Sequence, residues 1–517
     1  MMRVAIRVDA SAWLGSGHVM RCRALASELK SRGHLVVFVM RLLHDNLVMY
    51  TRTAGFEVLT LSDLDGGETA SQADWLKLAM QPALQLDDAN DTLALLDNQD
   101  WDWIVADHYA LGVIWQQAMA RGAKKMLVLD DEANCSLQCD VLVNQNPGAH
   151  VSHYDGLTPP HCLRLMGPQY ALLRPEFDNA ARSDSMHSHA AGSARVLVAL
   201  GGGNVHKLLL AVLSALGDCG LRGTGITVVA GAQPLHGNEL EQRSLALGYT
   251  RVCSTENMAN LMKDSDWAIG GGGVGLLERC VVGLPSITLI TAPNQRRGVM
   301  AAQAQGALVA IDPLDADFET RIRQAIKDML SSPDRLAAMS NTARSVCDGL
   351  GTPRVADILQ KGSLTLRVAT AQDSGALLTW RNAADTRRFS GNSQTISVEQ
   401  HEQWLQRVLA NPAQRLWIAC SASGPVGVLR LDTRLAGAAT VAEISVYRVP
   451  DLPGKGWGRA LIACGIQEAQ RIWSALSRID ARISDDNLAS LAAFGACGFT
   501  PSTTPGLHQK HIERICP

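Results

Sequence analysis

The sequence predicts an α/β protein with two successive series of alternating strands and helices, followed by a smaller α+β unit. The apolar run VAIRV, the helical segment HVMRCRALASELKSR and the run LVVFVM form a βαβ pattern at the start of the chain. The stretch RVLVALGGGN, at residues 195–204, begins a second series with a strand and a glycine turn. After residue 363 the alternation gives way to a mixed pattern. These observations predict parallel sheets in the first two parts of the chain and a mixed sheet in the third.

Length and composition indicate folded domains with a small-molecule partner. A chain of 517 residues is too long for one core, and about 150 residues per domain suggests three units. The hydrophobic fraction of 47% and the charged fraction of 19% predict folded structure throughout. Because 47 basic and 50 acidic residues give a formal charge of -3, neither nucleic acid nor an anionic membrane is expected as a partner.

The cysteines and the apolar runs predict a cytoplasmic protein with reduced thiols. The 12 cysteines form no CxxC pair, and Arg3, Arg7 and Asp9 interrupt the first apolar segment. The longest uncharged apolar stretch, residues 281–292, is too short to span a bilayer.

Three domains are expected, at residues 1–180, 194–361 and 363–517. The polar segment 181–193 is typical of an interdomain connection. Two α/β series that face each other would place their glycine-rich turns on one cleft.

The first glycine turn, GSGH, suggests a phosphate site next to a catalytic base. Gly15 and Gly17 let a phosphate approach the N–H groups at a helix start. The positive end of a helix favours the neutral imidazole of His18, which can take a proton from water. The alternative is a histidine that only caps or packs the helix start.

Polar residues at predicted strand ends support a shared crevice. In parallel sheets the carboxyl ends of the strands meet at one edge, although each of these residues alone can be a turn residue. They are Asp9, Asp107, His108, Tyr109, Asp130 and Asp131.

Several longer motifs carry a specific resemblance. RVDASAWLGSGHVMRC, ADHYAL, LDDEANCSLQCDVLVNQNPG, GPQYALLRPEF, LGGGNVHK, ENMANLMKDSDWAIGGGGVGLLERCVVGLPSI and PNQ together resemble the hydrolases of pseudaminic acid biosynthesis that release UDP from UDP-2,4-diacetamido-2,4,6-trideoxy-β-L-altropyranose. The resemblance covers roughly residues 2–360 and implies two Rossmann-like domains in a B-type glycosyltransferase arrangement.

The resemblance also implies the chemistry of this part. His18 would be the general base that activates water for inverting attack at the anomeric carbon, with Asp107 and Tyr109 beside it and Asp9 among the groups that bind substrate. Diphosphate is a good leaving group, so a base and fixed N–H donors can suffice, and no metal is expected.

The second glycine turn, GGGGVGLLERC, is expected to hold UDP. Gly271, Gly272 and Gly273 precede a helix that starts near Val274, so their amides would bind diphosphate and Glu278 would accept the ribose hydroxyls. Alternatively, the glycines allow close packing and Glu278 is a favourable acid in the first turn of a helix.

Further substrate contacts are expected near the same cleft. Gly202 belongs to a third glycine turn, in which GGN departs from the family pattern and leaves contacts from Asn204 open. Asn257, Met258 and Asn294 match family loops near the nucleotide, although surface polarity explains them nearly as well.

The segment LPGKGWGRALIACG resembles the pyrophosphate loop of the Gcn5-related N-acetyltransferases. Acetyl-CoA is therefore the expected cofactor of residues 363–517, bound at a helix N-terminus. The cofactor-binding residues would be Gly456, Gly458, Arg459, Ala460 and, in the matching N-x-x-S motif, Asn487.

Two departures from this family concern its chemistry. Pro453 replaces the usual Arg or Gln, and Phe494 stands where a tyrosine commonly protonates the leaving thiolate. Glu443 is a candidate base for the acceptor amine, or an ordinary strand residue.

The sequence thus predicts a bifunctional enzyme whose partners are a UDP-sugar, water and acetyl-CoA. Residues 380–405 resemble the acetyltransferase that acts on a UDP-4-amino-sugar one step before the hydrolase. The alternatives are a glycosyltransferase that passes the sugar to an acceptor and a sugar-nucleotide binding module without catalysis.

Overall fold

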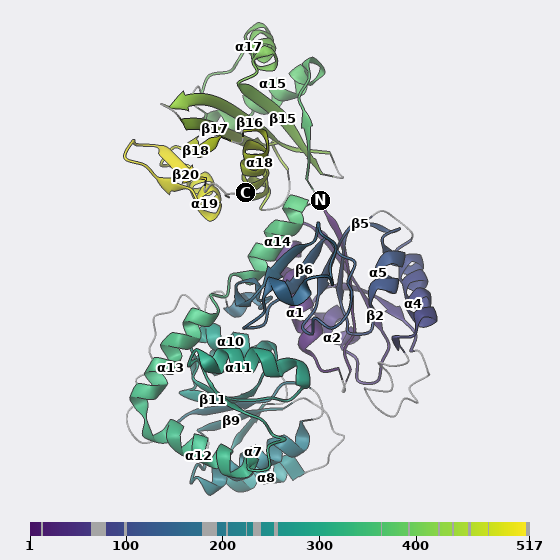
Figure 1. The fold of residues 1–517 in the computed structure, drawn as a ribbon, viewed down its shortest axis with the longest axis vertical. Coiled ribbons are helices and arrows are strands. Elements are labelled where there is room, and N and C mark those ends of the chain that lie inside the picture. Colours follow the sequence, from purple (N-terminus) through teal and green to yellow (C-terminus); the bar gives the residue numbers. More distant parts are fainter. Residues whose placement is uncertain are drawn as a thin grey trace. The chain divides into compact units, whose positions relative to one another are not determined.

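The described residues of the computed structural model form three sheets with surrounding helices (Figure 1). The expected connection 181–193, Asn204 and Pro453 lie outside these described residues. The structure describes residues 1–517 except 12–13, 64–78, 98–100, 178–193, 203–204, 224, 231–238, 253–256, 363, 391–392, 422–423, 437–438, 453–455, 474 and 513–517.

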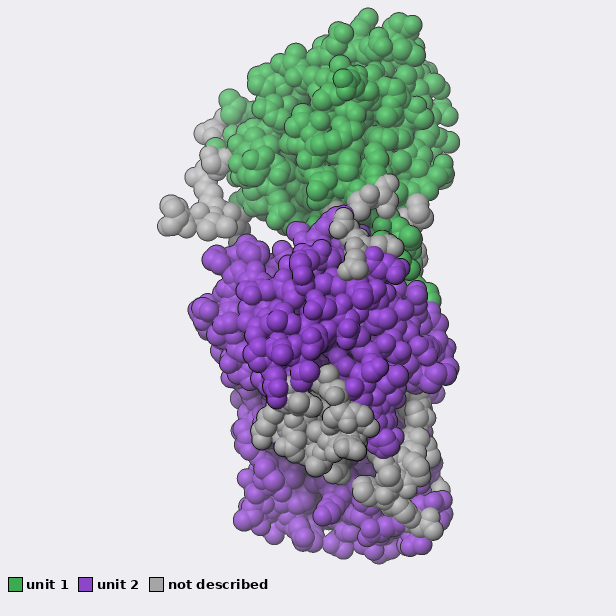
Figure 2. Space-filling model, turned by 90° about the vertical axis from the view of Figure 1, so that its right-hand side faces the viewer, with its two compact units in different colours: residues 1–3, 29–35, 356–517 green, residues 4–28, 36–355 purple. Residues whose placement is uncertain are grey.

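The chain divides into two compact units (Figure 2). Unit 1 contains residues 1–3, 29–35 and 356–517, and unit 2 contains residues 4–28 and 36–355. Unit 2 includes nearly all residues of both parallel sheets. The division between residues 180 and 194 therefore stays a prediction. Among the described residues, no helix has the length and apolar character that a membrane crossing requires.

The first sheet of unit 2 has the strand order β3-β2-β1-β4-β5-β6-β7. Strands β4 to β7 run parallel to one another, as do β1 and β4 and also β2 and β3. The strands are β1 (Arg3–Val8), β2 (Leu35–Arg41), β3 (Glu57–Leu61), β4 (Trp101–Asp107), β5 (Ala123–Leu129), β6 (Val141–Asn144) and β7 (Leu163–Met166). The helices are α1 (Gly17–Ser31), α2 (Val48–Thr53), α4 (Pro82–Leu95), α5 (Val113–Met119), η1 (Val151–Tyr154) and η2 (Pro168–Tyr170).

The second sheet of unit 2 is parallel, with the order β10-β9-β8-β11-β12-β13. Its strands are β8 (Val196–Ala199), β9 (Ile226–Val229), β10 (Thr250–Val252), β11 (Trp267–Gly271), β12 (Ser286–Leu289) and β13 (Val309–Ile311). The helices of this part are α7 (His206–Asp218), α8 (Glu239–Leu247), α9 (Met258–Lys263), α10 (Val274–Val282), η4 (Pro293–Gln295), α11 (Arg296–Ala304), α12 (Phe318–Ser331), α13 (Pro333–Val346) and α14 (Gly351–Gly362).

Helices cover both faces of this second sheet (Figure 1). Val196 and Val198 of β8 enter one hydrophobic cluster, and Leu197 enters another. Burial on both faces explains why these strands are continuous apolar runs instead of alternating ones. The two sheets have Rossmann-like strand orders, which confirms the predicted α/β fold class for this part.

Unit 1 contains a mixed sheet with the order β14-β15-β16-β17-β18-β20-β19. Only β17 and β18 pair in parallel, and α18 connects them. The strands are β14 (Thr365–Val368), β15 (Gln414–Ser421), β16 (Gly424–Ala436), β17 (Ala439–Arg448), β18 (Leu476–Arg482), β19 (Thr500–Pro501) and β20 (Leu507–His511). The helices are η5 (Ala371–Asp373), α15 (Ser374–Asn382), α16 (Ala384–Arg388), α17 (Val398–Ala410), α18 (Trp457–Ile472) and α19 (Leu488–Ala496).

Candidate functional site

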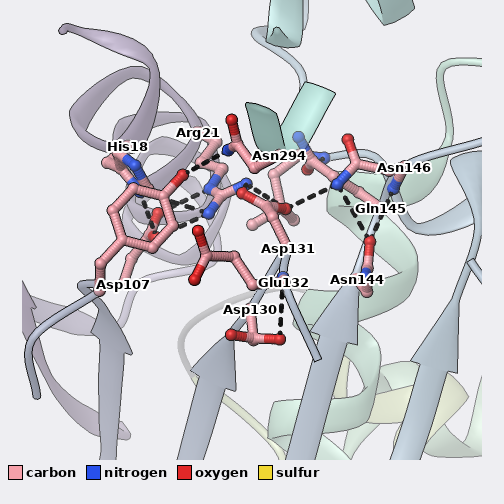
Figure 3. A network of polar contacts seen from close by, with 12 residues as sticks. His18, Arg21, Asp107, Asp130, Asp131, Glu132, Asn144, Gln145, Asn146 and Asn294 are labelled. Carbon is pink, nitrogen blue, oxygen red and sulfur yellow. Dashed lines mark hydrogen bonds and ion pairs between the residues drawn. The ribbon is translucent and has the colours of Figure 1, made fainter. Parts of the chain in front are cut away.

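Unit 2 gathers polar side chains at the carboxyl edge of its first sheet (Figure 3). The turn before α1 is closed by a hydrogen bond from the Gly15 amide to the Ser11 carbonyl at 2.9 Å, and Gly15 adopts a φ of 76° that favours glycine. Helix α1 then presents His18 from its first turn, and β4 ends at Asp107.

His18 and Asp107 form a short hydrogen bond. The distance from Nδ1 of His18 to Oδ1 of Asp107 is 2.6 Å, and the two side chains are 11% and 0% exposed. Since a carboxylate can only accept, Nδ1 carries the hydrogen of this bond, and in the neutral imidazole the lone pair is therefore on Nε2. The pair is thus oriented for Nε2 to accept a proton.

Arg21 holds Asp107 in its charged form. Its Nε and one terminal nitrogen donate to the two oxygens of Asp107 at 2.6 and 2.7 Å. Burial would raise the pKa of Asp107, but the charge of Arg21, together with the hydrogen bonds from Arg21 and His18, outweighs burial and holds that pKa well below its usual range. Asp107 therefore stays ionised at any physiological pH.

Asp131 extends this network toward the next strands of the sheet. Arg21 donates to its two oxygens at 3.0 and 2.9 Å, and Nδ2 of Asn146 donates to Oδ1 at 2.8 Å. Tyr154 donates to the carboxylate of Asp130 at 2.7 Å, and burial raises the pKa of Asp130. The edge of the sheet thus carries two neighbouring carboxylates with different hydrogen-bond partners.

Tyr109 connects the two halves of unit 2. Its ring meets the imidazole of His18 edge to face, with centroids 4.7 Å apart. Nδ2 of Asn294, from η4, donates to the Tyr109 hydroxyl at 2.7 Å. Burial, followed by the charge of Asp131, raises the pKa of Tyr109, so it remains a phenol that can donate its own hydrogen.

Asp9 lies beneath this edge rather than on it. Its carboxylate accepts from Arg7 at 2.6 and 2.9 Å and from the Arg41 amide at 2.7 Å, and it pairs with Nε2 of His108 at 3.2 Å. The Asp9 side chain is 0% exposed. This burial favours a role in positioning the strand ends over the expected contact with substrate.

The glycine turns of the two halves meet, as the facing arrangement requires. A Cβ at Gly15 would lie 3.0 Å from the carbonyl oxygen of Gly202, and one at Gly17 would lie 3.9 Å from the side chain of Val274. Any larger residue at Gly15 would separate the turns.

The turn before α10 combines close packing with open amides. A Cβ at Gly271 would lie 2.4 Å from the Leu200 carbonyl, and the Gly272 amide donates to Oε1 of Gln295 at 3.2 Å. Gly273 is the N-cap of α10, and the first bond of this turn runs from the Leu276 amide to the Gly273 carbonyl at 2.9 Å. The amides of Gly273, Val274 and Gly275 precede this bond, while Gly271 and Gly272 serve packing in this structure.

Glu278 has a partner that the sequence did not predict. Arg174 donates to its Oε1 at 3.0 Å, and the Glu278 side chain is 11% exposed. One carboxylate oxygen is thereby occupied, and the other remains for a ligand. Asn257 caps α9, next to Met258, and its Oδ1 accepts from Asn260 at 2.5 Å.

In unit 1 the strands β17 and β18 part near the predicted cofactor loop. Their pairing ends at Glu443 and Asp480, although β17 continues to Arg448. Gly456 starts α18 with a φ of 85°, and a Cβ at Gly458 would meet no described atom within 4 Å. A Cβ at Gly456 would meet the side-chain ends of Gln360 and Arg32, so the open space beside the start of α18 lies at Gly458.

The side chains of the other residues that the sequence analysis singled out in unit 1 contact neighbouring protein groups. The guanidinium of Arg459 pairs with Asp357 at 2.9 Å, so its side chain is not directed at the loop amides. Asn487 caps α19 by accepting from the Ser490 amide at 3.1 Å, and Glu443 lies 3.5 Å from Arg482. Phe494 is buried against Phe499, with ring centroids 5.0 Å apart.

Sequence reasoning missed Arg21, Asn146 and Arg174. Arg21 follows His18 by three residues and so shares its helix face, which was the available signal. Asn146 lies in the polar end of VLVNQN, whereas Arg174 carried no local signal. Among the described residues, no group of three or more His, Cys, Asp or Glu side chains is arranged to hold a metal.

Residues 363–500 match the acetyltransferase (GNAT) domain family. The chain is 28% identical over 368 residues to the spore coat polysaccharide biosynthesis protein SpsG of Bacillus subtilis, covering 69% of this chain and 98% of SpsG. It is 24% identical over 216 residues to the UDP-2,4-diacetamido-2,4,6-trideoxy-β-L-altropyranose hydrolase of Campylobacter jejuni, covering 42% of this chain and 66% of the hydrolase.

A third relative spans both parts. An uncharacterized protein of Methanocaldococcus jannaschii is 22% identical over 535 residues, covering 99% of this chain and 100% of that protein. These similarities support a role in sugar-nucleotide processing and confirm both predicted resemblances. The chain is a fusion of a segment homologous to the Campylobacter hydrolase with a C-terminal domain of the GNAT acetyltransferase family.

Proposed function

We propose that unit 2 hydrolyses the bond between UDP and 2,4-diacetamido-2,4,6-trideoxy-β-L-altropyranose. The observation that carries this proposal is the contact of 2.6 Å between His18 and Asp107 at the polar edge of the first sheet, which leaves Nε2 of the neutral imidazole as a proton acceptor. The homology to the Campylobacter hydrolase supports the choice of substrate.

His18 is the general base of this reaction. As the water oxygen forms its bond to the anomeric carbon, Nε2 takes the proton and the bond to the diphosphate oxygen breaks, which inverts the configuration. Asp107 fixes the ring and stabilises the imidazolium that forms, and Arg21 keeps Asp107 ionised. A positioned base of this kind contributes about 10²- to 10⁴-fold to the rate.

The start of α10 binds the leaving UDP. The amides of Gly273, Val274 and Gly275 and the positive end of the helix stabilise the negative charge that develops on the diphosphate. The second oxygen of Glu278 accepts from the ribose, and Asn257 and Met258 border the nucleotide. Gly15, Gly17 and Gly202 let the two halves close on the diphosphate.

Tyr109 and Asn294 hold the sugar between the halves. The Tyr109 hydroxyl accepts from Asn294 and retains its own hydrogen for a sugar oxygen or an acetamido carbonyl. The same bond keeps the Tyr109 ring against His18.

We further propose that the GNAT domain acetylates the 4-amino group of the UDP-sugar precursor. When bound, acetyl-CoA supplies the thioester carbonyl that the amine attacks. The amides of Gly456, Gly458 and Arg459 hold its diphosphate, whereas the Ala460 amide, expected to join them, donates to the Gly456 carbonyl at 3.0 Å. Asn487 borders the site by ordering the start of α19. Glu443 takes the amine proton where β17 and β18 part.

Hydrolysis in water enriched in oxygen-18 tests the site of attack. Attack at the anomeric carbon puts the heavy oxygen on the free sugar and leaves UDP light, whereas attack at phosphorus labels UDP. We expect label on the sugar alone, with no acceptor added. UDP binding without release would instead favour a transferase that needs an acceptor.

A further inference from the structure

Two cysteine side chains meet at the amino ends of β6 and β7. The Sγ atoms of Cys139 and Cys162 are 3.6 Å apart. Cys162 directly precedes Leu163, whose amide donates to the carbonyl of Asp140 at 2.8 Å, and Cys139 directly precedes Asp140. Neighbouring strands lie about 4.8 Å apart, a separation that a disulfide can bridge after small side-chain rotations.

The two thiols differ in exposure and acidity. Cys139 is 3% exposed, whereas Cys162 is partly exposed. The hydrogen bond with Cys139, and then the charge of Arg164, lower the pKa of Cys162, while that hydrogen bond and burial raise the pKa of Cys139. Because the thiolate is the reactive form, Cys162 is the thiol that a small oxidant attacks first.

We propose that Cys139 and Cys162 are a modification site that hydrogen peroxide converts into a reversible disulfide. The Cys162 thiolate forms a bond to one peroxide oxygen, the O–O bond breaks, and the other oxygen leaves as water after protonation. The Cys139 thiol then displaces the hydroxyl from the Cys162 sulfenic acid, which leaves as a second water. Two thiols are oxidised, one peroxide is reduced, and a dithiol reverses the reaction.

The disulfide closes a ring that includes part of the polar edge. Residues 139–162 contain Asn146, which donates to Asp131, and Tyr154, which donates to Asp130. The bond restricts this segment in the unfolded chain, so the oxidised protein is more stable. When neighbouring strands open locally, the disulfide also keeps residues 139–162 in place. This segment carries the side chains that bind Asp130 and Asp131.

Peptide mapping of the full chain tests the assignment. The protein is treated with hydrogen peroxide, its remaining thiols are blocked with N-ethylmaleimide, and a protease that cuts before aspartate separates Cys162 from the fragment that carries Cys135 and Cys139. We expect the two fragments to be joined, with the loss of two hydrogens, until dithiothreitol is added.

The variant Cys135→Ser identifies the partner, because Cys135 is exposed and lies on the same fragment as Cys139. The link must persist in this variant and disappear in Cys162→Ser. A link from Cys162 to Cys135, or full oxidation of Cys162 without any link, would overturn the proposal.

Thermal unfolding gives a second readout. Oxidation should raise the unfolding temperature of the wild type by about 5 °C and leave that of Cys162→Ser unchanged. If oxidation raised the unfolding temperature of both proteins equally, another thiol would cause the effect. That result would contradict a stabilising disulfide between Cys139 and Cys162.

Discussion

The imidazole of His18 and the carboxylate of Asp107 lie 2.6 Å apart, although 89 positions separate them in the chain. The turn before α1 and the end of β4 bring them together at one edge of the sheet. Arg21 binds the same carboxylate from the helix that carries His18. The position of the proton on the imidazole therefore depends on a contact between distant parts of the chain.

Asp107→Asn tests this dependence. An amide cannot accept from both His18 and Arg21 in one orientation, so the tautomer of His18 is no longer fixed. We expect UDP release to slow by about 10³-fold while UDP affinity, measured by calorimetry, changes little. Asp131→Asn is the matched control, because Asp131 binds Arg21 but not His18. Equal losses in the two variants would contradict the orienting role.

Tyr109→Phe and Asn294→Ala test the link between the halves. Each variant removes the hydrogen bond of 2.7 Å, and Phe keeps the ring against His18. We expect Asn294→Ala to lower kcat/KM for UDP release about fivefold, and Tyr109→Phe to lower it further because it also removes the hydroxyl that donates to the sugar. The double variant should lose little more than Tyr109→Phe alone, because Tyr109→Phe already removes the bond to Asn294. Fully additive losses would show that the two side chains act independently.

Acid stability tests the buried network beneath the site. Burial would raise the pKa of Asp88, but Arg7 and Arg41 outweigh burial and lower it to about 2. Its pKa in the unfolded chain is about 3.9, so its stabilising contribution is complete above that pH and is lost as pH falls toward 2.

Urea unfolding at several pH values measures this effect. The midpoint of the wild type should fall as pH decreases from about 5 to about 3, and Asp88→Asn should show a lower midpoint at neutral pH with a smaller decrease. If the urea midpoints of the two proteins decreased by the same amount as the pH falls, groups other than Asp88 would cause the acid sensitivity.

Gly458→Val tests the acetyl-CoA site. A side chain at Gly458 meets no described atom, so the variant should fold normally and obstruct the open space at the start of α18. We expect acetyl-CoA binding, measured by calorimetry, to weaken at least about tenfold. Gly375→Val is the matched control, since Gly375 is also the second residue of a helix with open space beside it. Unchanged affinity in Gly458→Val would place the cofactor elsewhere.

Much of the fold could be predicted because periodicity and glycine turns are local signals. The runs VAIRV and LVVFVM are β1 and β2, and the GSGH turn leads into α1. The predicted hairpin is β16 and β17, which pair antiparallel from Gly427 to Ala439. These features depend on residues that are close in sequence.

The partners of the site residues could not be predicted in the same way. Asp9 and Asp107 both end strands, yet Asp9 is enclosed by Arg7 and His108 while Asp107 contacts His18. Only the packing of the strands decides which carboxylate reaches the cleft. The contact of Glu278 with Arg174 joins residues 104 positions apart, and nothing local indicates it.

Release of UDP from UDP-2,4-diacetamido-2,4,6-trideoxy-β-L-altropyranose by the wild type and by His18→Ala, with neither acceptor nor acetyl-CoA present, tests the central claim most directly. We expect the wild type to release UDP and His18→Ala to be slower by at least about 10²-fold, with UDP affinity near normal. Undiminished release by His18→Ala would contradict the assignment of His18 as the base.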